Sequence, residues 1–374
     1  MPPVLRTAES TDRVVRIVWD DGTTSAFHHV WLRDNCLHCR HAATGHRVVE
    51  TSAIAGAAPA VVEIAQSGDL HVRWSDEHSS VYPAVWLRGH DYSNGVRRER
   101  IAPMLWDASG AGDLPAVDYP TLLTDPALKL SLMCGFRDRG VAILHGVPCE
   151  PGTVARVAER FGEVRTTGWG TVFDVRSVAD ANSVAYTNLP LVTHTDEAYR
   201  DPAPTIQLQH FLRTEAEGGE TTLADGFKVA ADLRAERPEL FDLLATVSLH
   251  FHFRDENNEH EHDAPVIELD TAGDVRAVRY SNHSVQPFLL PPDRMEAYYE
   301  AYTTFGRMRE SGRYRVTIRL GTGDLYMVDN RRVLHGRTGF SSGGARHLQS
   351  CYIERDELMS RLRVLAREHR SAVR

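Results

Sequence analysis

The residues best suited to chemistry in this chain are His194, Asp196 and the distant His335. Side chains two positions apart on an extended segment point to the same face, so His194 and Asp196 could bind one metal ion together. A further histidine would complete a set of two histidines and one carboxylate, which is typical of non-haem Fe(II) oxygenases because it leaves coordination positions open. The alternative for the pair alone is a surface or hydrogen-bonded histidine, since the chain has 19 histidines.

The surroundings of His335 favour the metal interpretation. An apolar run ends at Leu334, and Gly336 lets the backbone pass close to a neighbouring segment. Arg346 follows shortly, and an arginine can hold a carboxylate through two parallel hydrogen bonds. This region therefore combines a candidate metal ligand with a candidate anion anchor.

A second candidate site lies near the N-terminus, where residues 36–41 include two cysteines and two histidines. The chain has five cysteines, an odd number that is poor material for a disulfide framework. In a reducing compartment, a Cys-x-x-Cys pair suggests metal or redox chemistry. Four such ligands could hold a tetrahedral zinc ion, which would stabilise a small domain with a limited core. An empty or redox-active cysteine pair is the alternative.

Length and charge limit the protein classes. A chain of 374 residues exceeds the usual size of a single core, so one large and one smaller domain are expected. The formal net charge of -9 argues against a nucleic-acid partner, which requires clustered Lys and Arg. The N-terminus lacks the apolar core of a signal peptide, and no apolar run is long enough to span a membrane. We therefore expect a cytoplasmic protein that binds neither nucleic acid nor membrane.

The first hundred residues predict a small strand-rich domain. Alternating residues with intervening turns indicate strands at 13–19, 23–27, 61–65, 70–74 and 80–86. Residues 107–117 are small and rich in glycine, which is typical of a linker. The expected division is an N-terminal domain over 1–106, a linker over 107–117 and a larger domain over 118–374.

The larger domain mixes strands with a few covering helices. Helical patterns lie near 124–140, 153–161, 229–247, 293–309 and 357–368, and strand patterns at 141–144 and within 184–211. The expected fold class is α+β, mostly β with covering helices. For the catalytic domain we predict a double-stranded β-helix, or jelly-roll, with helical insertions.

Eight motifs follow one another along the chain. In the larger domain they are His194-Thr195-Asp196, Gly218-Gly219-Glu220-Thr221, Asp225-Gly226-Phe227, Asp329-Asn330, Leu334-His335-Gly336-Arg337 and Arg346-His347-Leu348. In the N-terminal domain they are Trp31-Leu32-Arg33-Asp34-Asn35-Cys36 and Trp74-Ser75-Asp76-Glu77-His78. Together they resemble the gamma-butyrobetaine and trimethyllysine dioxygenases, within the taurine-dioxygenase-like superfamily. The resemblance covers nearly the whole chain.

The resemblance implies a dioxygenase that uses Fe(II), 2-oxoglutarate and O2. His194, Asp196 and His335 would hold the iron. Arg346 would pair with the distal carboxylate of 2-oxoglutarate, and Thr221 would offer a hydroxyl nearby. The expected reaction is hydroxylation of an unactivated C–H bond in a small cationic amine or betaine-like zwitterion. Desaturation, cyclisation and C–N cleavage begin with the same hydrogen abstraction and stay open, as does a binding paralogue without turnover. A homodimer is also expected.

The resemblance also implies an aromatic cage for a trimethylammonium group. Such a group has no N–H donors and is held by ring faces instead. The cage residues would be Trp169, Phe173, Tyr186 and Tyr352. The alternative for any one of these rings is an ordinary core position.

Two positions depart from the family pattern. Glu197 stands where an aromatic residue is expected, and Ser183 replaces an asparagine that helps to bind the substrate carboxylate. Asn282 is expected to remain as a polar anchor. A carboxylate beside the cage could hold the cation more strongly or prefer an ammonium that bears N–H groups. The expected substrate is therefore gamma-butyrobetaine-like and not fixed as gamma-butyrobetaine.

For the N-terminal domain, the resemblance implies a structural zinc ion bound by Cys36, Cys39 and His78. The family usually has three cysteines at this site, whereas this chain has two. His38 or His41 would therefore supply the fourth ligand.

Overall fold

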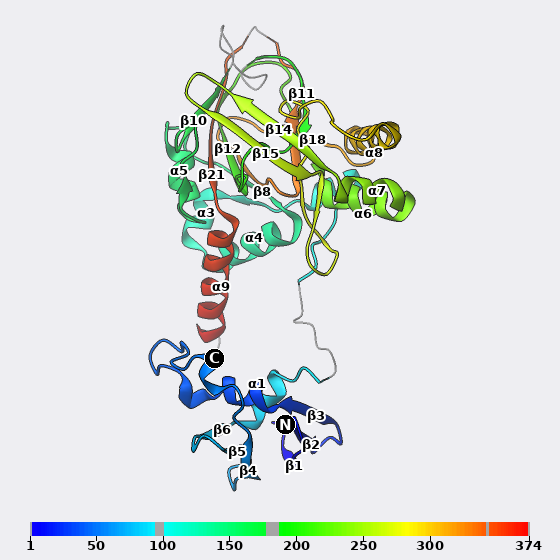
Figure 1. The fold of residues 1–374 in the computed structure, drawn as a ribbon. Helices are drawn as coiled ribbons and strands as arrows, with labels where there is room; N and C mark the ends of the chain where they lie inside the picture. Colours follow the sequence, from blue (N-terminus) through cyan, green and yellow to red (C-terminus); the bar gives the residue numbers. More distant parts are fainter. Residues whose placement is uncertain (1, 94–100, 177–186, 342–343, 373–374) are drawn as a thin grey trace. The chain divides into compact units, whose positions relative to one another are not determined.

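The computed structural model describes residues 2–93, 101–176, 187–341 and 344–372, and the chain forms two compact units, residues 1–101 and 102–374 (Figure 1). Each unit has a hydrophobic core of its own. Within the described ranges, no helix has both the length and the apolar character needed to cross a membrane.

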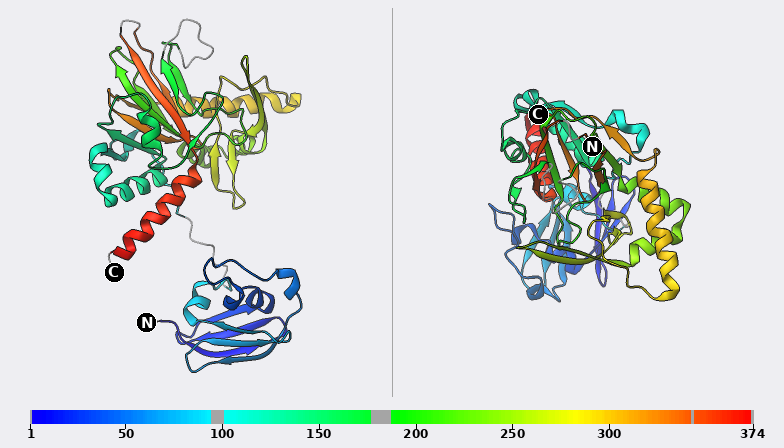
Figure 2. Two further views of the ribbon diagram at one scale, coloured as in Figure 1. Left: turned by 90° about the vertical axis from the view of Figure 1, so that its left-hand side faces the viewer. Right: turned by 90° about the horizontal axis from the view of Figure 1, so that it is seen from above.

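The smaller unit consists of two three-stranded antiparallel sheets (Figure 2). The strands are β1 (Leu5–Ser10), β2 (Val14–Trp19), β3 (Thr24–His28), β4 (Pro59–Ile64), β5 (Leu70–Trp74) and β6 (Ser79–Tyr82). Trp19 and Trp74 point inward and are buried, and their indole N–H groups donate hydrogen bonds to Ser25 (2.7 Å) and Ser80 (2.9 Å). These bonds satisfy the polar atom of each ring inside the core.

Two short helices complete the smaller unit, α1 (His29–Asp34) and α2 (Ala84–Gly89). The strand predicted over 80–86 ends at Tyr82. Pro83 cannot donate to the sheet, and its fixed φ suits the start of a helix, so the chain turns there into α2.

Residues 107–117 do not form a linker. They include the 3-10 helix η3 (Ala108–Asp113) and the start of β7 (Ala116–Asp118), both in the larger unit. Trp106 is buried just before them, and its backbone and indole N–H groups donate to the Asp225 carboxylate (3.1 Å) and the Arg139 carbonyl (2.8 Å). A glycine-rich segment can pack when a neighbouring aromatic residue anchors it, and its composition does not reveal this.

The larger unit is built on two sheets. The larger sheet has the order β10-β21-β12-β19-β8-β7, with β9 also paired to β21. Its further strands are β8 (Val141–His145), β9 (Val164–Arg165), β10 (Phe173–Arg176), β12 (Ile206–Thr214), β19 (Leu325–Asp329) and β21 (Arg346–Ile353). The smaller sheet has the order β11-β20-β13-β18. Its strands are β11 (Leu191–His194), β13 (Thr221–Asp225), β18 (Val316–Ile318) and β20 (Val333–Arg337).

Strand β12 shows how the sequence separates the two faces of the larger sheet. Ile206 and Leu208 belong to the core that the sheet shares with its covering helices. Gln207 and Gln209 point to the opposite face, where they line a cavity. The polar residues of this buried strand therefore mark the side on which ligands could bind.

Helices cover the outer faces of both sheets. The core of the larger sheet includes residues of α3 (Tyr119–Thr124), α4 (Pro126–Arg139), α5 (Thr153–Ala158) and α9 (Arg355–Ala372). A second core joins the smaller sheet to α6 (Gly226–Glu236), α7 (Pro238–Thr246) and α8 (Pro292–Glu310). The helix predicted over 229–247 is thus two helices, because Pro238 interrupts the backbone hydrogen bonds and starts α7.

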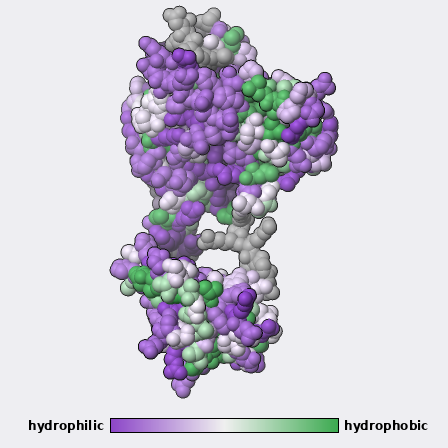
Figure 3. Space-filling model, in the orientation of Figure 1, coloured by the Kyte–Doolittle hydropathy of each residue, from purple (hydrophilic) through white to green (hydrophobic). Residues whose placement is uncertain are grey.

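Two hairpins complete the larger unit, β14 (Ser248–Arg254) with β15 (Glu259–Pro265) and β16 (Ile267–Leu269) with β17 (Val275–Val278). In Figure 3 the visible face of this unit is mostly hydrophilic, with hydrophobic residues gathered on the side of α8. Sheets with covering helices give an α+β fold, as the sequence predicts.

Candidate active site

The three residues predicted to bind iron lie together. Strands β11 and β20 pair in antiparallel fashion, and His194 stands directly opposite His335. Asp196 Oδ1 lies 3.2 Å from His194 Nε2 and 3.4 Å from His335 Nε2. Gly336 permits this approach, because a Cβ at that position would collide with the Leu191 carbonyl oxygen of β11.

Asp196 reaches the cluster from a turn. Strand β11 ends at His194, so the expectation that one strand presents both ligands is wrong for Asp196. Asn330 fixes the turn: its side-chain oxygen accepts from the Asp196 N–H (2.7 Å), and its side-chain N–H donates to the carbonyls of Asp196 (3.1 Å) and Pro204 (2.9 Å). The position of this ligand therefore depends on a side chain far away in the sequence.

The two oxygens of the Asp196 carboxylate have different partners. Gln207 Nε2 and the Tyr352 hydroxyl (2.8 Å) donate to Oδ2, which leaves Oδ1 facing the histidines. Burial acts to raise the pKa of Asp196, but the neighbouring His335 and His194 lower this pKa well below its usual range. The carboxylate is therefore ionised and presents one oxygen to the cluster.

The geometry fits an iron ion. His194 Nδ1 lies 3.0 Å from the Val192 carbonyl, which can only accept, so Nδ1 carries the proton and Nε2 keeps its lone pair for a metal. The three ligand atoms all lie within 4.8 Å of one another. Neighbouring positions on an octahedral ion with bonds of about 2.1 Å are roughly 3 Å apart. Three such ligands leave three positions open for other molecules.

A cavity of about 510 Å³ lies between the two sheets and includes the cluster in its lining. Arg346 lines it from β21, and Thr221 lines it from β13. Burial lowers the pKa of the Arg346 guanidinium, and only Tyr326 acts in the opposite direction. Among the described residues, no carboxylate forms an ion pair with Arg346. A buried guanidinium without a carboxylate partner among these residues is suited to bind the distal carboxylate of 2-oxoglutarate.

Aromatic side chains form one wall of the cavity. Three of the predicted cage residues, Trp169, Phe173 and Tyr352, are part of its lining. Phe173 and Tyr352 have ring centroids 5.5 Å apart. Tyr199 and Phe253 also line the cavity, with stacked rings 4.9 Å apart, and Trp169 lies 5.5 Å from Phe253. The wall is therefore larger than the sequence predicts.

Two acidic residues are found among the described residues that line the cavity. One is the ligand Asp196, and the other is Glu197. It is only 7% exposed, and its Oε2 lies 3.2 Å from Arg200 Nε. Burial, and next the neighbouring Asp196, raise the pKa of Glu197 to about 7, although Arg200 acts to lower it. Its backbone has a φ of 47°, a left-handed conformation that is rare for residues other than glycine.

The remaining residues predicted to bind the substrate are Ser183, Tyr186 and Asn282. Ser183 and Tyr186 lie outside the described residues. Asn282 is exposed and accepts a hydrogen bond from the Tyr302 hydroxyl (2.7 Å), and it is not among the residues that line the cavity. Its neighbours Ser281 and His283 line the cavity instead. The role predicted for Asn282 therefore stays a prediction, and the cavity lining favours its two neighbours.

Several residues of the site were missed from the sequence: Tyr199, Gln207, Phe253, His283, Asn330 and Arg337. Polar residues in a buried strand were the available signal for Gln207. Phe253 lies on the β14–β15 hairpin and lines the cavity, and the sequence of its own strand does not indicate this position.

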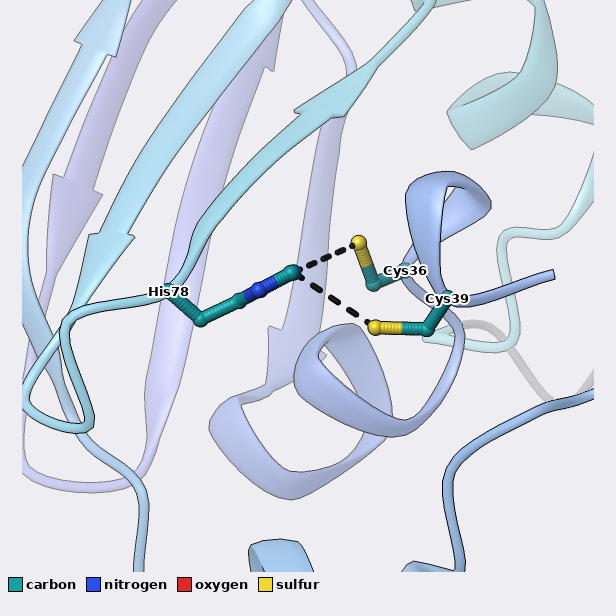
Figure 4. Close-up of side chains that lie close together, drawn as sticks. All are labelled: Cys36, Cys39 and His78. Atoms are coloured by element: carbon teal, nitrogen blue, oxygen red, sulfur yellow. Dashed lines mark hydrogen bonds between the residues drawn. The ribbon is translucent and has the colours of Figure 1, made fainter.

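The predicted zinc residues of the smaller unit also lie together (Figure 4). His78 Nε2 lies 3.2 Å from Cys36 Sγ and 3.5 Å from Cys39 Sγ. Neither candidate for a fourth ligand, His38 or His41, belongs to this group within the described residues. His41 Nδ1 lies 3.1 Å from the Thr44 hydroxyl instead.

Two sheets hold a His-Asp-His cluster beside an arginine that pairs with no carboxylate of the described ranges. This is the site of a 2-oxoglutarate-dependent non-haem iron dioxygenase, and the chain is of this class. Residues 97–352 match the family described as Taurine catabolism dioxygenase TauD, TfdA family, and the chain belongs to this family. Residues 6–99 match the family described as Gamma-butyrobetaine hydroxylase-like, N-terminal.

Similar proteins cover the whole length of the chain. A gamma-butyrobetaine dioxygenase of Pseudomonas sp. (strain AK-1) is 39% identical over 97% of this chain and 96% of its own length. The human gamma-butyrobetaine dioxygenase is 29% identical over 98% of both chains. A trimethyllysine dioxygenase of Meyerozyma guilliermondii is 29% identical over 97% of this chain and 96% of its own.

Proposed function

We propose that this dioxygenase hydroxylates an unactivated C–H bond of a small cationic amine or betaine-like zwitterion, similar to gamma-butyrobetaine. The observation that carries the proposal is the wall formed by Trp169, Tyr199 and Phe253, which lines the same cavity as the iron ligands. Ring faces attract a cation, and a cation held there lies close to the metal cluster. The names of the similar proteins support the same substrate class.

The roles of the residues follow from their positions. His194, Asp196 and His335 would hold Fe(II), and Arg346 with Thr221 would hold the distal carboxylate of 2-oxoglutarate. When bound, these cofactors supply the oxidation: one oxygen atom of O2 enters the substrate C–H bond, the other enters succinate, and carbon dioxide is released. The chain's own contribution is to orient the substrate and to exclude water from the enclosed space.

Tyr352 links the two parts of the site. Its hydroxyl donates to Asp196 Oδ2 at 2.8 Å, while its ring lies 5.5 Å from Phe173 in the aromatic wall. A substrate packed against this ring is therefore at a fixed distance from the iron ligand. Such positioning decides which C–H bond is attacked.

The proposal is tested with the full-length protein, Fe(II), 2-oxoglutarate and a panel of small amines and betaines. The expected result is succinate release together with a product heavier than the substrate by one oxygen atom. A product lighter by two hydrogen atoms would indicate desaturation instead. Equal succinate release with and without every panel member would overturn the substrate class.

We further propose a zinc ion at Cys36, Cys39 and His78, with the fourth ligand still to be identified. The ligand distances of 3.2 and 3.5 Å support it, because sulfur and nitrogen ligands of tetrahedral zinc lie roughly 3.6 Å apart. Thiolate ligands suit a reducing compartment such as the cytoplasm. Stoichiometric zinc in the purified protein tests this site, and its absence would contradict the assignment.

We also propose a double-stranded β-helix for the larger unit and a homodimer as its assembly. The two sheets, which are antiparallel except for the β7–β8 pair and share a core, support the first proposal. Exposed apolar residues beside and on α8, such as Leu289 (94% exposed), support the second. Light scattering at several protein concentrations checks the assembly.

A further inference from the structure

We propose that the cationic group selected by this site carries at least one N–H, so that a protonated primary, secondary or tertiary amine is preferred over a quaternary ammonium. The inference rests on the proposed function, because it concerns the substrate of the same cavity. It goes beyond an aromatic cage, which attracts any cation and does not distinguish these groups.

Buried hydrogen-bond acceptors in the cavity carry the inference. Glu197 and Gln207 both line the cavity and are 7% and 3% exposed. No described residue donates to Gln207 Oε1 or to either Glu197 oxygen with full hydrogen-bond geometry, although the side chains of Trp169 and Arg200 both act on Glu197. Buried polar atoms are nearly always paired, so unfilled acceptors in a ligand cavity indicate donors on the ligand.

The orientation of Gln207 is fixed by its other contact. Its Nε2 donates to Asp196 Oδ2, an ionised carboxylate oxygen that can only accept. The amide therefore cannot turn over to offer its N–H to another group. Gln207 Oε1 must remain an acceptor.

Glu197 keeps acceptor capacity despite its ion pair. Arg200 Nε lies 3.2 Å from Oε2, and Arg200 also has His260 as a partner at 3.1 Å. A carboxylate has about four lone-pair positions, and one guanidinium contact leaves most of them open. An ammonium N–H could fill them, whereas a trimethylammonium group has no N–H to offer.

The energetic consequence favours amines that donate. A buried acceptor without a partner costs about 1–3 kcal/mol, which corresponds to roughly a 5- to 150-fold loss. A site built to hydrogen-bond an N–H rejects an analogue that lacks it more strongly than a purely apolar pocket could. Binding a quaternary ammonium would enclose both acceptors and satisfy neither.

A series of four substrates that differ only at nitrogen tests the inference: 4-aminobutyrate and its N-methyl, N,N-dimethyl and N,N,N-trimethyl derivatives. We measure kcat/KM of the full-length enzyme from product formation. We expect it to be at least about tenfold higher for one N–H-bearing member than for the trimethyl member. The Glu197→Leu variant should lose this preference and retain turnover of the trimethyl compound.

Two controls accompany the variant. Glu197→Gln keeps the size of the side chain and an acceptor oxygen, so it should show a smaller loss of preference, and it remains informative if Glu197→Leu does not fold. Glu239→Leu removes an exposed carboxylate that pairs with Arg237 and should leave the preference unchanged.

The outcomes separate the two proposals. A trimethyl compound that is turned over best by the unaltered enzyme would overturn the N–H inference and leave the proposed function standing. An N–H preference that persists in folded Glu197→Leu would overturn the role of Glu197. No product from any of the four compounds would count against both proposals.

Discussion

The two clusters of potential metal ligands in this chain have the same number of members but different surroundings. Cys36, Cys39 and His78 belong to the smaller unit, and they do not line the cavity of the larger unit. His194, Asp196 and His335 line a cavity of about 510 Å³. The first cluster suits the structural zinc ion proposed above, whereas the second lines a cavity where other molecules can bind.

The supporting contacts differ in the same way. Arg33 donates to Cys39 Sγ (3.4 Å) and pairs with Asp76 (2.9 Å), so a cation faces the thiols. At the other cluster, Asn330 accepts a hydrogen bond from the Asp196 backbone N–H, and Gln207 donates one to the Asp196 carboxylate. Burial raises the pKa of the Cys39 thiol, and Arg33 acts to lower it, whereas Asn330 and Gln207 fix the direction of a single carboxylate oxygen.

The largest expected effect comes from an iron ligand. His335→Ala should lower amine-dependent succinate formation by more than about 100-fold. Mutation of a residue that only hydrogen-bonds to a metal ligand already lowers metal affinity or activity by about 10- to 100-fold, and His335 is itself a ligand. Zinc content and thermal unfolding of the smaller unit should stay unchanged. Undiminished turnover in a folded variant would contradict the iron assignment.

Removal of a zinc ligand should have the next largest effect, and in the other unit. Cys39→Ser should abolish zinc binding and destabilise residues 1–101 by several kcal/mol, because structural zinc contributes about 10 kcal/mol or more in small domains. Zinc analysis and hydrogen exchange measure the change. Cys149→Ser, at an exposed cysteine, is the matched control, and equal zinc in both variants would refute the site.

A smaller effect should follow from loss of the Asp196 clamp. Asn330→Ala removes three hydrogen bonds around the turn and should weaken Fe(II) binding by about 10- to 100-fold. Titration of Fe(II) under anaerobic conditions measures this affinity. Asn282→Ala, at an exposed asparagine, should change it less than about twofold, and similar losses in both variants would argue against a specific clamp.

The smallest effect concerns a buried histidine that belongs to neither cluster. Burial lowers the pKa of His210 below its ordinary value. The unfolded chain therefore takes up the proton first as the pH falls below about 6.5, and the folded state loses stability in that range. His210→Gln should make the free energy of unfolding depend less on pH between pH 7.5 and 5.5, as measured in urea titrations. An unchanged slope would assign the pH dependence to other groups.

The sequence indicates three members of each cluster because their chemistry is tied to residue type, but neither His38 nor His41 joins Cys36, Cys39 and His78 in the described residues. His194, Asp196 and His335 are recognisable by type and motif, even though Asp196 lies in a turn and not in a strand. The supporting residues are less predictable. Asn330 and Gln207 act on Asp196 through contacts that only the tertiary fold creates.

Segment boundaries and loop residues were the weakest predictions. Trp106 anchors a glycine-rich segment that composition alone identifies as a linker. Asn282 does not line the cavity, although its neighbours Ser281 and His283 do. In each case a single long-range contact decides the outcome, and local sequence patterns contain no information about it.

The pairing of His194 with His335 also has a consequence for folding order. The two histidines come from strands that are far apart in the chain, and a slip of one residue in their register would turn His335 away from Asp196. During synthesis, the N-terminal part of the chain emerges with its ligands separated until strand β20 is complete. The complete set of three ligands therefore exists only once strand β20 has been made and has paired with β11.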